Sequence, residues 1–294
     1  MNSYLVLESG ELFSGNLVGD WTPGMARAGE VVFNTSHSGY EEIATDPSYF
    51  SQIVVYTAPM QGNYGTSEDF RESRAIWAQG VICLQMQKSE RNRSWLNRLR
   101  SQEIPVLEGV DTRHLVLRLR EKGTPWGAIV AANSRDEALA LAHSLIARKK
   151  AQSKDWVWET SRREPIELMG DLPQGPRCAI LDLGCKENIV RLARQRSSLV
   201  KIFPSRTSGQ QILDFKPQVV ILSNGPGDPA DVQESVETIR RLVGRVPIFG
   251  ICMGHQLLSL ALGAKTFRLR FGHRGANHPI SDQLLNKVYV SSQN

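Results

Sequence analysis

Long apolar runs and paired cysteines are both missing from this chain of 294 residues. No stretch reaches the ~18 apolar residues that a membrane-spanning helix needs, and the first residues do not form a signal peptide. The four cysteines have neither a CxxC spacing nor a disulfide pattern. We therefore expect a cytoplasmic protein with reduced thiols that does not associate with a membrane.

Clustered positive charge and nucleotide-binding motifs are also missing. The sequence pI is about 9.1 and the formal net charge is +5, but the basic residues are scattered. The densest group, Arg91–Arg100, is typical of a solvated helix, so we expect no nucleic-acid partner. There is no Gly-x-x-x-x-Gly-Lys-Ser/Thr, which predicts that this chain carries no cofactor of its own, and we expect no metal site.

What is present divides the chain into an α/β protein of two domains. Residues 1–150 begin with short alternating segments, such as Tyr4–Phe13 and Gly29–Phe33, which predict strands of a mixed β-rich domain. Helices are expected later in this domain, over Trp95–Gln102, Thr112–Lys122 and Arg135–Lys149, the last capped by Ser134. The charged, Pro- and Gly-containing segment 151–176 is predicted to be a linker.

Residues 177–294 alternate between apolar strands and helices. The strands are expected over 178–183, 199–203, 218–222 and 247–251, and the helices over 187–196, 208–215 and 231–242. Continuous apolar strands of this kind predict a parallel sheet covered on both faces. Ligands of such sheets bind beyond the carboxyl ends of the strands, where two glycine-containing loops follow strands here.

The first of these loops is a nucleophile elbow. Gly250-Ile-Cys-Met-Gly254 lies between an apolar run and an amphipathic one, and the two glycines permit the tight turn that a strand-to-helix elbow requires. A thiol at a helix N-terminus is favoured as the thiolate. Most lone cysteines are buried structural residues, but the flanking glycines favour Cys252 as a nucleophile.

The second loop, Ser223-Asn-Gly-Pro-Gly-Asp-Pro229, exposes backbone N–H groups where no Cβ obstructs a substrate. Such a loop suits oxyanion stabilisation or amide binding, although on its own it is more often an ordinary βα turn. Its position one βα unit before the elbow favours the functional interpretation.

These two loops resemble those of the class I glutamine amidotransferases, which implies a flavodoxin-like parallel sheet. The resemblance narrows to the small subunit of carbamoyl-phosphate synthetase. It is carried over nearly the whole chain by Val31-Val-Phe-Asn-Thr-Ser36 with Gly39-Tyr40, Thr45-Asp-Pro-Ser-Tyr49, Gly109-Val-Asp-Thr-Arg113, Arg120-Glu-Lys-Gly123, Gly263-Ala-Lys265 and Phe271-Gly-His-Arg-Gly-Ala-Asn-His-Pro279.

The resemblance implies that Cys252 attacks the side-chain amide of glutamine and releases ammonia through a thioester. It further implies main-chain oxyanion donors and side chains that grip glutamine: Met253, Gly225, Gly227, Ser48, Gln256 and Asn294. Ser48 follows a proline and Asn294 is the last residue of the sequence, so each also has an ordinary structural interpretation.

The sequence departs from the family pattern near its end. Family members continue with a glycine-aromatic segment and later a His-Pro-Glu that carries the catalytic base and its partner, whereas none of the six histidines here has Glu two places on. We expect a C-terminally shortened member whose hydrolytic activity is in doubt, with Lys287–Ser292 left as an exposed edge strand. A substitute base among His255, His273 and His278 is the alternative.

The family resemblance also implies a partner. An intact small subunit passes ammonia to a large subunit that uses ATP and Mg²⁺ to make carbamoyl phosphate, so a heterodimer or a higher assembly is expected. A non-catalytic subunit that only docks on the large subunit is the alternative function, and an amidotransferase of another pathway leaves residues 1–150 without explanation. Whether the product serves arginine or pyrimidine synthesis stays open.

Overall fold

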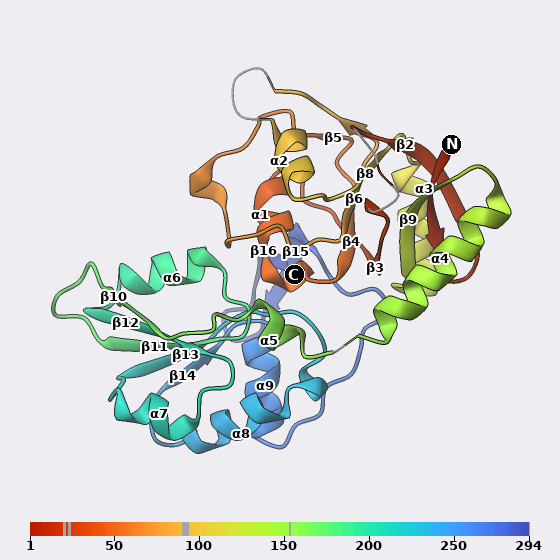
Figure 1. Ribbon diagram of the computed structural model, residues 1–294. Coiled ribbons are helices and arrows are strands. Elements are labelled where there is room, and N and C mark those ends of the chain that lie inside the picture. The colour runs from red at the N-terminus through yellow and green to blue at the C-terminus, as the bar shows by residue number, and fades with distance from the viewer. Residues whose placement is uncertain (20–21, 23–24, 90–93, 153, 294) are drawn as a thin grey trace. The chain divides into compact units, whose positions relative to one another are not determined.

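The computed structural model describes residues 1–19, 22, 25–89, 94–152 and 154–293. Its chain forms two compact units (Figure 1). The first contains Met1–Thr45, Ser51–Gln152 and Arg268–Asn294, and the second contains Asp46–Phe50 and Ser153–Phe267. A short segment of the N-terminal region therefore belongs to the second unit.

Strands of the first unit close into a barrel in the order β1-β2-β8-β6-β4-β3-β9. Their bounds are β1 Asn2–Leu7, β2 Leu12–Leu17, β3 Arg27–Asn34, β4 Gln52–Tyr56, β6 Gly80–Ile82, β8 Val106–Glu108 and β9 Trp126–Ala132. Leu5 and Leu7 join the same core cluster as Ile129, whereas Val6 packs in a second cluster with α4. This alternation follows the two-residue period of a strand. The sequence predicted a β-rich domain but not the closure of its strands.

The helices of the first unit are α1 Tyr40–Thr45, α2 Trp95–Ser101, α3 Thr112–Lys122 and α4 Arg135–Lys150. Three were predicted from the sequence, and Ser134 caps α4 by accepting a hydrogen bond from the N–H of Glu137 at 3.1 Å. Short elements complete the region: η2 Pro47–Tyr49 in the second unit, and in the first unit η3 Glu68–Phe70 and the pair β5 Met60–Gln61 with β7 Gln85–Met86. Arg91, the start of the predicted solvated helix, lies outside the described residues.

The second unit contains a five-stranded sheet in the order β10-β12-β11-β13-β14. Its strands are β10 Ile166–Met169, β11 Arg177–Asp182, β12 Leu199–Pro204, β13 Val219–Leu222 and β14 Ile248–Gly250. The last four are parallel, and β10 runs antiparallel to β12. The predicted α/β fold with a parallel sheet is thus confirmed.

Helices cover both faces of this sheet. Cys178 and Ile180 of β11 pack with α6, while Ala179 and Leu181 pack with α7, α8 and α9. In Figure 1, α6 lies on one side of the sheet, with α7 and α8 on the other. The bounds are α6 Glu187–Arg194, α7 Gly209–Asp214, α8 Gln233–Leu242 and α9 Met253–Ala261, with η4 Pro229–Asp231 before α8. Apolar residues on both sides of each strand explain its continuous apolar sequence.

Two segments add detail to the sequence-based expectation. The predicted linker 151–176 contains two short elements, α5 Trp156–Thr160 and β10, and both belong to the second unit. The strand expected over Lys287–Ser292 exists as β16 (Lys287–Gln293), but it does not edge the parallel sheet. It pairs with β15 (Gly275–Asp282) in a separate hairpin that belongs to the first unit.

The hairpin has a local cause. The carboxylate of Asp282 accepts hydrogen bonds from the N–H groups of Leu284 and Leu285 at 3.0 Å, and Asn286 adopts a positive φ of 48°. Asp and Asn favour such turns, which return the chain along β15. The domain boundaries 1–150 and 177–294 stay predictions.

No helix in the described ranges is both long enough and apolar enough to cross a bilayer.

Replacement of Ile129 by Ala tests the barrel core. Its side chain is fully buried among Leu5, Val31 and Leu107, so Ile129→Ala is expected to lower the free energy of unfolding by about 2–5 kcal/mol. Leu141→Ala, at a position on α4 that is 36% exposed, is the control and is expected to cost under about 1 kcal/mol. Urea unfolding measures both; equal losses would contradict the assigned core.

Candidate functional site

Cys252 stands at a strained turn between β14 and α9. Its φ of 51° and ψ of −111° lie outside the regions that L-residues ordinarily adopt. The carbonyl of Cys252 accepts the hydrogen bond of the Gln256 N–H at 3.1 Å, so the helix begins directly after the thiol. Strain of this kind at a strand-to-helix junction is the geometry of a nucleophile elbow. The side chain is half-buried.

Two glycines make this turn possible. A Cβ on Gly250 would lie 2.7 Å from the backbone of His255, and one on Gly254 would lie 2.3 Å from the carbonyl oxygen of Leu222. Neither backbone can move aside without breaking the sheet or the helix, so both positions require glycine. The N–H of Gly254 donates to the carbonyl of Ser223 at 3.0 Å, which ties the elbow to the glycine loop.

The glycine loop follows β13 and packs closely against the backbone that follows β11. A Cβ on Gly225 would lie 2.0 Å from the carbonyl oxygen of Leu183, and Gly227 has a φ of +89° with Trp156 as its neighbour. The hydroxyl of Ser223 accepts a hydrogen bond from the N–H of Leu183 at 2.9 Å. The loop is therefore rigid, and its glycines leave the backbone free of side chains.

Ser48 reaches this loop from a distant part of the sequence. The side-chain amide of Asn224 donates to Ser48 Oγ at 3.0 Å and to Asp46 Oδ1 at 3.1 Å. Asp46 also accepts from the N–H of Ser48 at 2.9 Å, which forms the short helical turn η2. Ser48 thus lies beside the residue that precedes Gly225.

The carboxylate of Asp46 is 1% exposed and forms an ion pair with Lys186, Nζ to Oδ2 at 2.8 Å. A buried carboxylate without a cation and hydrogen-bond donors would be strongly unfavourable. Lys186 follows β11, and its N–H donates to Asn224 Oδ1 at 3.0 Å. Lys186, Asp46 and Asn224 were not predicted from the sequence. The signal that could have found Lys186 and Asn224 is their position just beyond the carboxyl ends of parallel strands.

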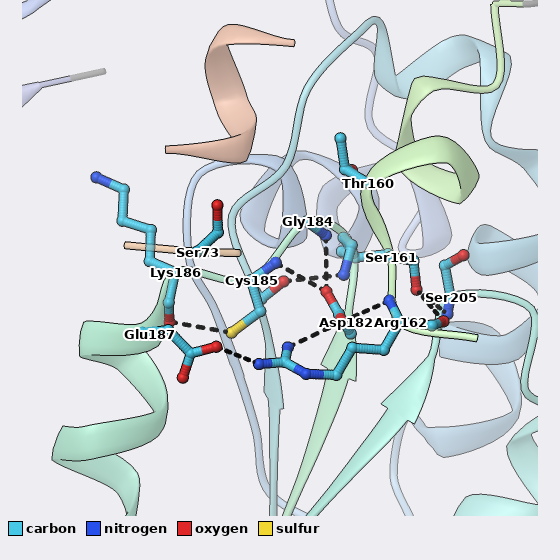
Figure 2. Close-up of polar contacts among 12 residues, drawn as sticks. Ser73, Thr160, Ser161, Arg162, Asp182, Gly184, Cys185, Lys186, Glu187 and Ser205 are labelled. Carbon is cyan, nitrogen blue, oxygen red and sulfur yellow. Dashed lines mark hydrogen bonds and ion pairs between the residues drawn. The ribbon is translucent and has the colours of Figure 1, made fainter. Parts of the chain in front are cut away.

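A second ionic group holds the loop that carries Lys186 (Figure 2). Asp182, which is buried at the end of β11, accepts from the N–H and Nη1 of Arg162 at 2.9 and 3.0 Å. Its other oxygen accepts from the N–H groups of Gly184 and Cys185 at 2.9 and 2.8 Å. Arg162 also pairs with Glu187. Burial alone would lower the pKa of Arg162, but Asp182 and Glu187 outweigh it and raise the pKa.

The other predicted site residues lie on or beside the same elements. Met253 has a buried side chain in the core, so only its main chain is available to a ligand, and Gln256 is exposed one turn along α9. Asn294 lies outside the described residues. Ser48, Gly225, Gly227, Cys252, Met253 and Gln256 all belong to the second unit. Their roles toward a ligand stay predictions.

The candidate bases differ in their surroundings. His255 is exposed on α9, and in the part of the chain that the structure describes its imidazole has no hydrogen-bond or ion-pair partner. His273 and His278 form an edge-to-face pair with ring centroids 5.4 Å apart in the first unit. Within the described residues, no three His, Cys, Asp or Glu side chains are grouped to hold a metal ion.

Comparison with known proteins places this geometry in a family. Residues 5–129 match the model of the carbamoyl-phosphate synthase small chain, CPSase domain, and residues 179–294 match the class-I glutamine amidotransferase model. The chain is 42% identical to a carbamoyl phosphate synthase small chain of Listeria monocytogenes, over 99% of this chain and 78% of the relative. It is 38% identical to one from Methanococcus maripaludis, over 100% and 79%.

An aminopeptidase from Aneurinibacillus sp. strain AM-1 aligns with 90% of this chain and 69% of its own at 11% identity, but the TM-score of 0.28 is too low to bear on the fold.

The rate of alkylation is expected to distinguish Cys252 from the other three thiols. Burial raises the pKa of Cys83 to about 12 and the pKa of Cys178 to about 11, and it raises the pKa of Cys185 well above its usual value. Since the thiolate is the reactive form, these three stay protonated at neutral pH, whereas Cys252 is half-buried at a helix N-terminus. Iodoacetamide followed by peptide mapping is expected to label Cys252 first, with the others gaining label only at alkaline pH. Earlier labelling of a buried thiol would contradict the site.

Proposed function

The chain belongs to the carbamoyl-phosphate synthase small-chain family, and we propose that it is the glutaminase subunit of a glutamine-hydrolysing carbamoyl-phosphate synthase. The observation that supports this most directly is the elbow: Cys252 at a positive φ, followed by α9 and tied through Gly254 to the glycine loop. A cysteine at such a strand-to-helix turn is typical of a nucleophile that attacks a carbonyl carbon.

The reaction follows from the groups present. The thiolate of Cys252 attacks the side-chain amide carbon of glutamine, and the carbonyl electron pair moves to oxygen. Backbone N–H groups of Met253, Gly225 and Gly227 are the proposed donors to this oxyanion. The nitrogen of the tetrahedral intermediate takes up a proton, which replaces the one that the thiol lost to solvent when it ionised. Collapse of the intermediate then breaks the C–N bond, releases ammonia and leaves a glutamyl thioester. Water then hydrolyses the thioester to glutamate and regenerates the thiol.

Glutamine is proposed to be held by Ser48 and Gln256. Asn294, the third residue that the resemblance implies, lies outside the described residues, and its role stays a prediction. A hydroxyl and carboxamides can satisfy the ammonium and carboxylate of a free amino acid, since they both donate and accept hydrogen bonds. Ser48 is positioned for this by Asn224 and Asp46.

The released ammonia is proposed to pass to an ATP-dependent large subunit, which uses ATP and Mg²⁺ and forms a heterodimer with this chain. The printed sequence has no phosphate-binding loop, which agrees with nucleotide chemistry on the partner. A cytoplasmic location is proposed because the four cysteines of the sequence have no disulfide pattern. The names of the relatives, small chains of carbamoyl phosphate synthase, support a partner of this kind.

A subunit that only docks is the second candidate function. The observation behind it is that His255, the histidine nearest to Cys252 in the sequence, is exposed on α9 and its imidazole has no hydrogen-bond or ion-pair partner among the described residues. A general base typically contributes on the order of 10² to 10⁴ in rate. This candidate predicts a complex that makes carbamoyl phosphate from ammonia but not from glutamine.

Replacement of the nucleophile tests the proposal. Cys252→Ser is expected to lower kcat/KM for glutamate release from glutamine by on the order of 10⁴ or more, because the hydroxyl is a far weaker nucleophile at neutral pH. Ammonia-dependent carbamoyl phosphate synthesis by the reconstituted complex is expected to be unchanged. Cys178→Ser, at a buried thiol of the same unit, is the control and retains glutaminase activity. Unchanged glutamate release in Cys252→Ser would rule out the assigned nucleophile.

If the unsubstituted chain releases no glutamate yet supports the ammonia reaction, the docking function holds.

The support of Ser48 gives a separate prediction. Asn224→Ala removes the amide that donates to Ser48 and Asp46, so the KM for glutamine is expected to rise about tenfold, or about 1.4 kcal/mol, with a smaller change in kcat. Gln210→Ala, at an exposed position on α7, is the control and leaves both constants unchanged. Steady-state glutaminase kinetics measure the two effects; an unaltered KM in Asn224→Ala would contradict the role given to Ser48.

A further inference from the structure

Helix α3 carries apolar side chains next to its fully buried side. The buried side contributes Leu115 and Leu119 to the core, and the half-buried Val116 packs against them while Leu117 is exposed. Arg113, Val116, Leu117 and Arg120 follow the i, i+3, i+4, i+7 spacing, which places them on one face of the helix. We refer to these four residues as the α3 outer face. An ordinary surface helix is polar on its outer side, whereas this face has an apolar centre.

The α3 outer face borders a hollow of about 300 Å³, which is completed by Thr57 and Thr112. Thr57 follows β4, and Thr112 is the first residue of α3. Leu117 is 53% exposed beside this hollow. All six residues belong to the first unit, and no acidic side chain borders the hollow. The hollow is therefore apolar at its centre and positive at both ends.

The two arginines lack the partners that their neighbour has. Arg118 of the same helix forms ion pairs with Glu11 at 2.5 Å and with Glu121 at 2.8 Å. Among the described residues, neither Arg113 nor Arg120 forms an ion pair or hydrogen bond through its side chain, and the Arg120 guanidinium lies over the ring of Phe271, 5.8 Å from the centroid. Two exposed guanidinium groups are thus available to a partner, and neither belongs to the glutamine site.

The distance between Arg113 and Arg120 indicates how far apart the negative charges of a partner would be. Seven residues at ~1.5 Å per residue separate Arg113 and Arg120 by about 10 Å along the helix axis. A single carboxylate or phosphate spans far less than this, since it accepts from one guanidinium at about 3 Å. Two carboxylates on a protein segment, with apolar side chains between them, match both arginines and cover Leu117 at once.

We propose that the α3 outer face docks an acidic segment of the ATP-dependent chain, a segment with two carboxylates about 10 Å apart that flank apolar side chains. This assignment rests on the proposed function, which supplies the partner. The α3 outer face belongs to the first unit and Cys252 to the second, so docking and glutamine hydrolysis are separable by substitution.

Charge reversal tests the docking face. Binding of the full chain to the ATP-dependent chain is measured by isothermal titration calorimetry at two salt concentrations. R113E/R120E is expected to raise the Kd on the order of 100-fold, because two attractive contacts become repulsive, and the alanine pair R113A/R120A about tenfold. Higher salt weakens binding of the unsubstituted chain more than that of the alanine pair.

A matched control is available on α4. R135E/R148E makes the same change in net charge at exposed positions, and in both pairs one arginine lies in the first turn and one in the last turn of its helix. This control is expected to bind within about twofold of the unsubstituted chain. Circular dichroism verifies that all variants are folded.

Three outcomes would overturn the proposal, and they are distinguishable. Equal binding by R113E/R120E and R135E/R148E rejects the α3 outer face alone. A dimer of the chain by itself that R113E/R120E dissociates assigns the face to a second copy. If the unsubstituted chain does not bind the ATP-dependent chain at all, both the docking face and the proposed assembly fail, whereas glutamate release still reports on Cys252.

Discussion

The arrangement of the candidate site depends on one buried carboxylate. Asp46 is 1% exposed, and its charge is balanced by Lys186 at 2.8 Å and by hydrogen bonds from Ser48 and Asn224. Because an unpaired buried carboxylate costs several kcal/mol, these groups hold one another in place. The consequence is that Ser48, which lies 176 positions from Asn224 in the sequence, is held beside the glycine loop.

The elbow depends on space and not on charge. The backbone of Cys252 is held at a φ of 51°, and such strain persists only where the surrounding structure imposes it. Here it is imposed by the close approach of Gly250 and Gly254 to the next helix and strand, and by the hydrogen bond from Gly254 to Ser223. These contacts with the sheet and with α9 hold the backbone of Cys252 in one position. The loop after β11 is held by charge instead: Asp182 accepts hydrogen bonds from the loop and pairs with Arg162, which also pairs with Glu187.

Sequence patterns predicted the elements of the second unit well, because apolar strands and amphipathic helices have distinct periods. They also identified the elbow and the glycine loop, since both depend on glycines at fixed places. They did not predict the closed barrel or β10, because the pairing of strands is a long-range property. The hairpin of β15 and β16 was missed although Asp282 and Asn286 carried its turn signal. Lys186 could be placed beside the glycine loop only once the strand order was known, whereas Asn224 lies in that loop and only its contacts with Ser48 and Asp46 required the structure.

Cys252 is proposed to attack the glutamine amide and to carry the acyl group. Mass spectrometry of the chain, quenched in acid during glutamine turnover and digested, detects this acyl group. One glutamyl thioester is expected, located on the peptide that contains Cys252, and hydroxylamine is expected to remove it. Glutamate release with no acylated Cys252 peptide, or with the acyl group on another residue, would contradict this proposal.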